Sequence, residues 1–160
     1  MPPSATKRLG DGMQFRIFFV ASAFLISALA ASAVAGTCDT PNPNFELAKP
    51  SASVDPSVAA FAGKWLGSWR INTPRQVLIL CTRLYVNVVD SSNAKVAYCR
   101  GTLTEVGRQP SCSLSDVKIA GGVLTIRAQT FKVAGPNTLS AQGEAQGTRN
   151  PIYAEFHREQ

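Results

Sequence analysis

The side chains that most often catalyse reactions are scarce in this chain and are spread far apart. His157 is the only histidine, and it falls on the polar face of the last predicted strand. Asp and Glu stand singly after the N-terminal segment, so no two of them have the spacing of an acid/base pair. The sequence contains no G-x-S-x-G elbow, no phosphate-binding P-loop and no H-E-x-x-H motif. We therefore expect a protein that is not an enzyme and that carries no metal or cofactor.

Four cysteines have the chemistry for two disulfide bonds or for a zinc site. They are Cys38, Cys81, Cys99 and Cys112. An even number after a predicted export signal makes two disulfides the default in an oxidising compartment. Of the three possible pairings we favour Cys99 with Cys112, across neighbouring strands, and Cys38 with Cys81, which would fix the N-terminal segment to the folded domain. Zinc is disfavoured because no C-x-x-C spacing occurs and only one histidine is present.

Ligand binding is the function that the residue types favour. Trp65, Gly67 and Trp69 occupy alternating positions, so in a strand their side chains share one face. Residues predicted to face the same interior from later strands are Leu84, Tyr98, Ala141 and Gly143. Small residues opposite large ones either leave a pocket for one hydrophobic or amphipathic molecule or only fit the taper of a barrel. The sequence leaves both interpretations open.

A two-residue alternation of apolar side chains predicts the strands that would position these residues. The first strand carries the two tryptophans, and seven more are expected at 77–89, 95–100, 113–119, 123–129, 130–134, 138–146 and 152–158. No helix is long enough for a parallel crossover, so the order is an antiparallel meander. We predict an all-β, eight-stranded up-and-down barrel with a short N-terminal helical turn capped by Asp55. A β-sandwich is the alternative.

The first 35 residues have the layout of a secretory signal peptide. Basic residues precede an apolar stretch at 17–30, and small residues then suggest cleavage after Ala33 or Ala35. Translation could start at Met1 or Met13. The apolar stretch is shorter than the ~20 residues of a comfortable membrane span. We expect an extended, proline-containing arm at 36–60, a barrel domain at 61–160, and a periplasmic or secreted protein without a stable membrane anchor after cleavage.

The charge of the mature chain does not indicate a nucleic-acid partner. Thirteen Lys and Arg face nine Asp and Glu after residue 35, a net charge near +4. The basic residues are mostly single, and no aromatic residues are interleaved to form a stacking platform. We expect no nucleic acid among the partners.

Three segments resemble a known kind of domain. They are FAGKWLGSW at 61–69, CT at 81–82 and VAYCRG at 96–101. The opening G-x-W resembles that of lipocalins and calycins, and the ordered set is similar to a small lipocalin-like domain of bacterial secreted proteins, over residues 61–128. The resemblance implies an arginine, here Arg158, lying over Trp65. It also supports a bond between Cys99 and Cys112, which fall where aromatic residues are expected in such relatives.

These observations lead to two expectations for function. The first is an exported, non-catalytic protein that holds a small hydrophobic or amphipathic molecule in its barrel. The alternative is a module that binds an exported protein, such as a periplasmic enzyme inhibitor acting through loops at one barrel end. Residues 101–111 form the longest predicted connection and are the candidate loop for that second role.

Overall fold

The structure is a computed structural model that describes residues 34–35, 38–144 and 150–160. Almost all of the predicted signal peptide therefore lies outside the described residues, including the cleavage position Ala33, whereas the alternative cleavage position Ala35 is described. Residues 36–37 of the predicted arm and 145–149 of the predicted barrel domain also lie outside the described residues.

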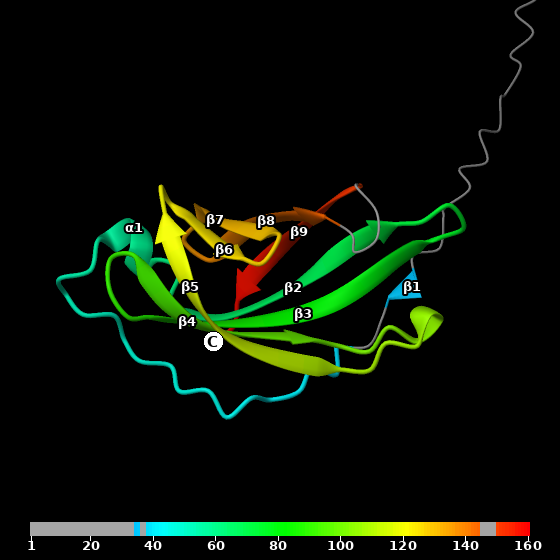
Figure 1. Ribbon diagram of the computed structural model, residues 1–160, viewed down its shortest axis with the longest axis horizontal. Helices are drawn as coiled ribbons and strands as arrows, with labels where there is room; N and C mark the ends of the chain where they lie inside the picture. Colours follow the sequence, from blue (N-terminus) through cyan, green and yellow to red (C-terminus); the bar gives the residue numbers. More distant parts are fainter. Residues whose placement is uncertain (1–33, 36–37, 145–149) are drawn as a thin grey trace, which may run out of the picture. The chain divides into compact units, whose positions relative to one another are not determined.

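Eight antiparallel strands close into an up-and-down barrel (Figure 1). They are β2 (Gly63–Asn72), β3 (Val77–Val88), β4 (Asn93–Arg100), β5 (Ser111–Ala120), β6 (Val123–Ile126), β7 (Gln129–Gly135), β8 (Thr138–Glu144) and β9 (Pro151–Arg158). Each of these strands pairs with the next in the chain, and β9 pairs with β2 to complete the circle. The predicted barrel is confirmed, and the β-sandwich alternative is wrong. A two-residue strand, β1 (Val34–Ala35), pairs in parallel with β3.

The two-residue alternation of the sequence becomes the inside and outside of the barrel. In β2 both tryptophans are fully buried, whereas Ser68 between them is exposed. Gly67 allows β9 to approach closely, because a Cβ at this position would lie 2.5 Å from the carbonyl oxygen of Glu155 and 2.6 Å from the ring of Phe156. A glycine in a strand often marks such a close approach. The core therefore runs along the barrel axis, with Leu84 and Val86 of β3 fully buried in it.

The stretch predicted as one strand at 123–129 is divided in the structure. β6 ends at Ile126, and Arg127 and Ala128 form a two-residue turn before β7 begins at Gln129. Arg127 takes a left-handed conformation with φ of 54°. Two-residue hairpin turns usually place Gly, Asn or Asp at such positions. The prediction missed the turn because the sequence carries none of these residues there.

A short helix covers one end of the barrel. In α1 (Pro56–Ala59) the carboxylate of Asp55 accepts a hydrogen bond of 2.8 Å from the backbone N–H of Ser57, which confirms the predicted capped turn. Val58 and Phe61 are buried in the same core as the tryptophans. This end of the barrel is therefore closed by the chain itself.

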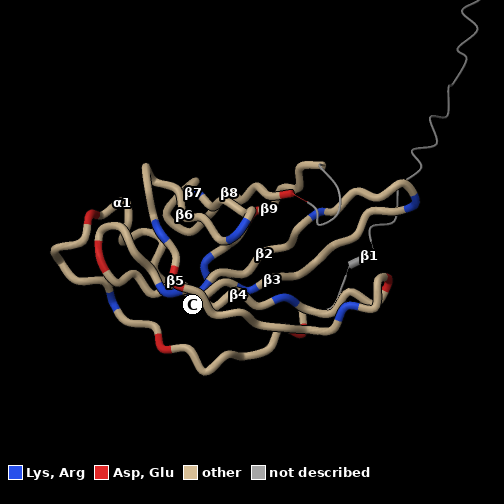
Figure 2. Tube along the Cα trace, in the orientation of Figure 1, with Lys and Arg blue, Asp and Glu red and all other residues tan. Residues whose placement is uncertain are grey.

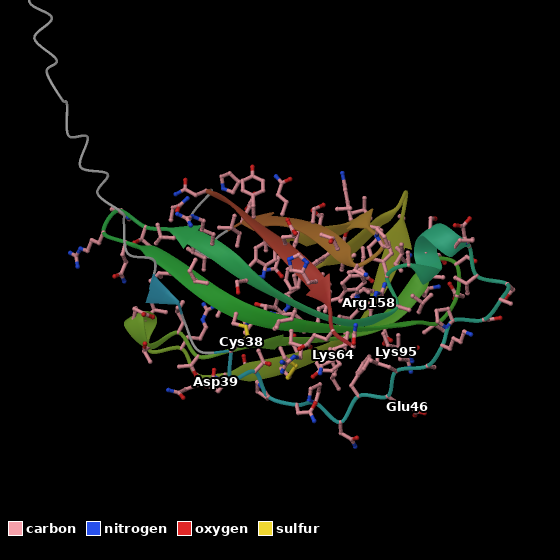
Figure 3. The ribbon with its side chains drawn as sticks, turned by 180° about the vertical axis from the view of Figure 1, so that it is seen from behind. Cys38, Asp39, Glu46, Lys64, Lys95 and Arg158 are labelled. Carbon is pink, nitrogen blue, oxygen red and sulfur yellow. A yellow bond between two sulfur atoms is a disulfide. The ribbon has the colours of Figure 1, made fainter. Side chains whose placement is uncertain are left out.

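The N-terminal arm is fixed to the outer wall. Disulfide bonds join Cys38 to Cys81 and Cys99 to Cys112, the two favoured pairs. Figure 3 shows Cys38 where the arm meets the barrel. Farther along, Phe45 packs on the ring of Tyr85 with 6.1 Å between the centroids. The two bonds fit an oxidising compartment.

No helix among the described residues has the length and apolar character needed to traverse a lipid bilayer.

Candidate ligand-binding site

A cavity opens at the barrel end away from α1. Its volume is about 680 Å³, within the ~300–1,000 Å³ that small-molecule sites usually occupy. It lies where β2 and β3 turn, where β4 runs into the 101–110 connection, and where β6 turns into β7. The apolar part of its wall comes from the inward rows of the strands: Trp69, Leu78, Leu80, Ile126 and Ile152. The cavity therefore has an apolar interior and a rim made of turns and loops.

The indole of Trp69 and the phenol of Tyr98 form a polar pair in this wall. Trp69 Nε1–H donates a hydrogen bond of 2.7 Å to the Tyr98 hydroxyl, and both residues are buried. The rings of Phe131 and Phe156 meet the indole edge to face at 6.1 and 6.0 Å, so its orientation is fixed.

Burial is the main influence on the Tyr98 hydroxyl, and it raises the pKa of this group above its usual value of 10.0. Hydrogen bonds with Gln129, Thr82 and Trp69 oppose part of that shift. A neutral phenol retains its proton, so Tyr98 presents a hydrogen-bond donor as well as an acceptor beside the apolar surface. The arrangement can orient a small molecule that has one polar group.

Three arginines contribute to the rim of the cavity. Arg100 ends β4, Arg108 lies in the connection to β5, and Arg127 occupies the left-handed turn. Burial lowers the pKa of the Arg100 guanidinium, and the positive charges of Arg108 and Arg127 lower it further. A non-glycine residue in the left-handed region costs roughly 1–2 kcal/mol, so the Arg127 turn is strained. Elsewhere basic and acidic residues are interspersed along the described trace (Figure 2).

The connection that carries Arg108 is held in place by hydrogen bonds. The N–H of Leu103 and of Arg108 each donates to the other residue's carbonyl oxygen at 3.0 Å, around a single helical turn, η1 (Thr104–Val106). The carboxylate of Asp39 accepts from the backbone N–H and the hydroxyl of Thr102 at 2.8 and 2.6 Å. The arm thus anchors the loop at the cavity rim.

The structure brings only part of the predicted binding set to the cavity. Trp69 and Tyr98 line it, whereas Trp65 and Leu84 are fully buried in the core and do not. Trp65 is covered instead by Arg158, whose guanidinium carbon lies 4.1 Å from the ring centroid. This contact, which the family resemblance implied, is confirmed.

The small residues of β8 do not line the cavity. Ala141 is buried opposite Phe131, and the space beside Gly143 is taken by Gln129, whose Cγ would lie 2.9 Å from an added Cβ. Large side chains from β7 therefore fill the room that the small residues leave. In this part of the barrel the structure fits the tapering interpretation.

Sequence reasoning missed the arginines and most of the apolar wall. Arg100 shares the phase of Val96 and Tyr98, so the two-residue pattern could have placed it inside. No comparable signal exists for Arg127, because its turn lacks the usual residues. Arg108 reaches the rim through a loop whose path the sequence does not specify.

His157, the only histidine of the sequence, lies on the outer surface of the barrel. Its Nε2 lies 3.2 Å from an oxygen of Glu155, and both side chains are about two-thirds exposed on the outer surface. No group of three or more His, Cys, Asp or Glu that could hold a metal ion occurs within the described ranges.

Comparisons with known proteins locate the fold but not a family. No protein-family model and no curated protein sequence matches the chain. A redesigned β-barrel has a TM-score of 0.51 at 9% identity, and the match covers 68% of this chain and 100% of that one. At this identity the likeness concerns the fold alone.

Two further solved structures are less similar. A de novo designed fluorescence-activating β-barrel has a TM-score of 0.48 at 11% identity, over 64% of this chain and 97% of that one. The siderocalin Ex-FABP, described as functioning through dual ligand specificities, has a TM-score of 0.38 at 14% identity, over 62% of this chain and 71% of that one.

Proposed function

We propose that this chain is an exported, non-catalytic binding protein that holds one small hydrophobic or amphipathic molecule in the barrel cavity. The observation that carries the proposal is the cavity of about 680 Å³ whose apolar wall contains the buried Trp69–Tyr98 hydrogen bond. Apolar concave sites with a few fixed polar groups are the usual form of small-molecule sites. The predicted export signal and the two disulfides support a periplasmic or secreted location.

The uncharged fluorophore N-phenyl-1-naphthylamine provides a direct test. Its emission should rise saturably as it leaves water for the cavity. Ser113 lines the cavity with a small, half-buried side chain, so Ser113→Phe should fill the space and abolish the signal. The neighbouring Leu114 is 67% exposed on the outer face, and Leu114→Phe is the matched control. Equal binding by both variants, or no binding by the wild type, would contradict the proposal.

A second candidate function is recognition of an exported protein through the 101–111 loop. It is favoured by Val106, an apolar residue of η1 that is 57% exposed at the cavity rim. Single exposed apolar residues are common, so a partner would need contacts beyond this one. Native mass spectrometry of protein purified from its export compartment separates the two functions: a retained small molecule supports the carrier, and a co-purifying protein supports the module.

A further inference from the structure

Among the described residues that line the cavity, the arginines at its rim carry more positive charge than Glu144, the one acidic residue, balances. Arg100, Arg108 and Arg127 line it together with Glu144, and no residue of the described chain forms a salt bridge with any of the three arginines. Two other arginines of the barrel do have structural partners. Arg83 is bound by Glu159, and Arg158 donates to backbone carbonyls beside Trp65. The rim arginines are thus available to a ligand.

Arg100 stands at the boundary between the apolar interior and the rim. It follows Tyr98 by two residues in the inward row of β4, and it is half-buried. Burial and the charges of Arg108 and Arg127 lower the pKa of its guanidinium, which nevertheless stays charged because the usual value is so high. A bound anion would replace the hydration that the Arg100 guanidinium loses on burial. It would also offset the electrostatic repulsion among the three guanidinium groups.

Arg127 supplies an independent observation. Its left-handed φ of 54° occurs at the first position of a two-residue turn, where glycine has no steric cost. Backbone strain of this kind is concentrated at functional sites. The strained backbone of Arg127 therefore supports a functional role for its side chain at the cavity rim.

We infer that the bound molecule is an amphipathic anion, with its apolar body in the cavity and a carboxylate, phosphate or sulfate head held by Arg100, Arg108 and Arg127. This inference rests on the proposed function of the same cavity. Guanidinium groups bind such oxygens through two parallel, charge-assisted hydrogen bonds. The hydrogen-bonded 101–110 connection holds Arg108 at the rim before the ligand arrives, so little ordering is needed on binding.

The test compares probes that share one apolar chain and differ in the head group. Isothermal titration calorimetry at pH 8 would use dodecanoate, 1-dodecanol and dodecyltrimethylammonium below their aggregation concentrations. We expect dodecanoate to bind about tenfold or more tightly than dodecanol, since hydrogen bonds to charged groups are the stronger ones. The cationic probe should bind most weakly. The preference for dodecanoate should shrink as salt is raised, because the rim is partly exposed.

Variants separate a role in binding from a role in folding. Arg100→Gln should lower the affinity for dodecanoate about tenfold and leave that for dodecanol unchanged. Arg127→Gly removes the charge and relieves the backbone strain of the turn. It should therefore weaken dodecanoate binding while it raises the midpoint temperature of thermal unfolding. Arg70→Gln is the matched control, because it removes the same charge from an exposed β2 position outside the cavity.

The outcomes distinguish the two proposals. Equal affinities for dodecanoate and dodecanol, with both lost in Ser113→Phe, would overturn the anion inference and leave the carrier function standing. The anion inference would also be overturned, and the carrier function left standing, if Arg70→Gln weakened dodecanoate binding as much as Arg100→Gln does. Failure of all three probes to bind would overturn both the inference and the proposed function.

Discussion

The guanidinium of Arg158 lies over the indole of Trp65, with 4.1 Å between its central carbon and the ring centroid. The same guanidinium donates hydrogen bonds to the carbonyl oxygens of Ala62 and Ala60 at 2.5 and 2.9 Å. The indole Nε1–H of Trp65 donates to the carbonyl of Phe61 at 2.9 Å. Two side chains from the barrel thus hold the short segment between α1 and β2. Figure 3 shows Arg158 toward this end of the molecule.

Replacing Arg158 should destabilise the fold without changing the cavity. We expect Arg158→Met to lower the free energy of unfolding by about 2–3 kcal/mol, through the lost stacking and the two backbone hydrogen bonds. Arg158→Lys should lower the free energy of unfolding by roughly half as much, because an ammonium keeps the charge but lacks the planar, two-donor geometry of the guanidinium. Urea denaturation measures both. His157→Gln, on the exposed face, is the control. A lysine variant as stable as wild type would show that the two-donor geometry of the guanidinium does not contribute to stability.

Gly67 should tolerate no side chain. A Cβ there would lie within 2.6 Å of Phe156 and even closer to the Glu155 backbone, so Gly67→Ala must push β9 away from β2. We expect Gly67→Ala to lower the free energy of unfolding by about 2–3 kcal/mol or to prevent folding. Gly135→Ala is the control, because the nearest atom to its added Cβ lies 3.9 Å away. That variant should stay within roughly 1 kcal/mol of wild type in the same denaturation assay. Similar losses in the two variants would contradict the close approach of the strands.

The two disulfides should differ in their contribution to stability. Cys38 and Cys81 are 43 residues apart, and Cys99 and Cys112 are 13 apart. In the chain-entropy model this separation predicts about 4 kcal/mol for the first bond and about 3 kcal/mol for the second. Paired cysteine-to-alanine variants, compared by denaturation under non-reducing conditions, measure this order. A larger loss from the Cys99–Cys112 pair would show that strand packing outweighs chain entropy here.

Stability should fall in acid partly through Glu159. Burial alone would raise the pKa of this carboxyl, but the hydrogen bonds and charge of Arg83, together with the charge of Lys64, outweigh it and lower the pKa below its usual 4.5. A carboxyl with a lowered folded pKa stabilises the fold above its unfolded pKa. That contribution is lost as the pH falls through the folded value.

The variant Glu159→Gln isolates this effect. At pH 7 it should be less stable than wild type by less than about 1 kcal/mol, because solvent screens the pair. The difference should narrow below pH 4.5 and vanish once the wild-type carboxyl is protonated. Urea denaturation of both proteins between pH 2 and pH 7 measures this difference in stability. Glu105→Gln, in η1, is the control, and a difference that did not depend on pH would contradict the ion pair.

Most of the fold could be predicted from the order of residues in single strands. Alternation at Trp65, Gly67 and Trp69 marks an inner face, because successive side chains of a strand point to opposite sides. The same rule predicted that Leu84 faces the interior, and its side chain is fully buried. Eight short strands without a helix long enough for a parallel crossover then predicted a closed antiparallel meander. The turn at Arg127 was missed, because its conformation is imposed by the pairing of β6 with β7 and not by the residues in it.

The sequence by itself determined which side chains point inward, because this depends on the alternation within each strand, whereas it left three cysteine pairings open. Only the tertiary structure decided where the interior stays open. Trp65 and Trp69 are equivalent in the pattern, yet Trp65 is covered by Arg158 from β9 and Trp69 faces the cavity. That difference depends on which distant side chains meet across the closed barrel. No spacing within one strand encodes such a meeting.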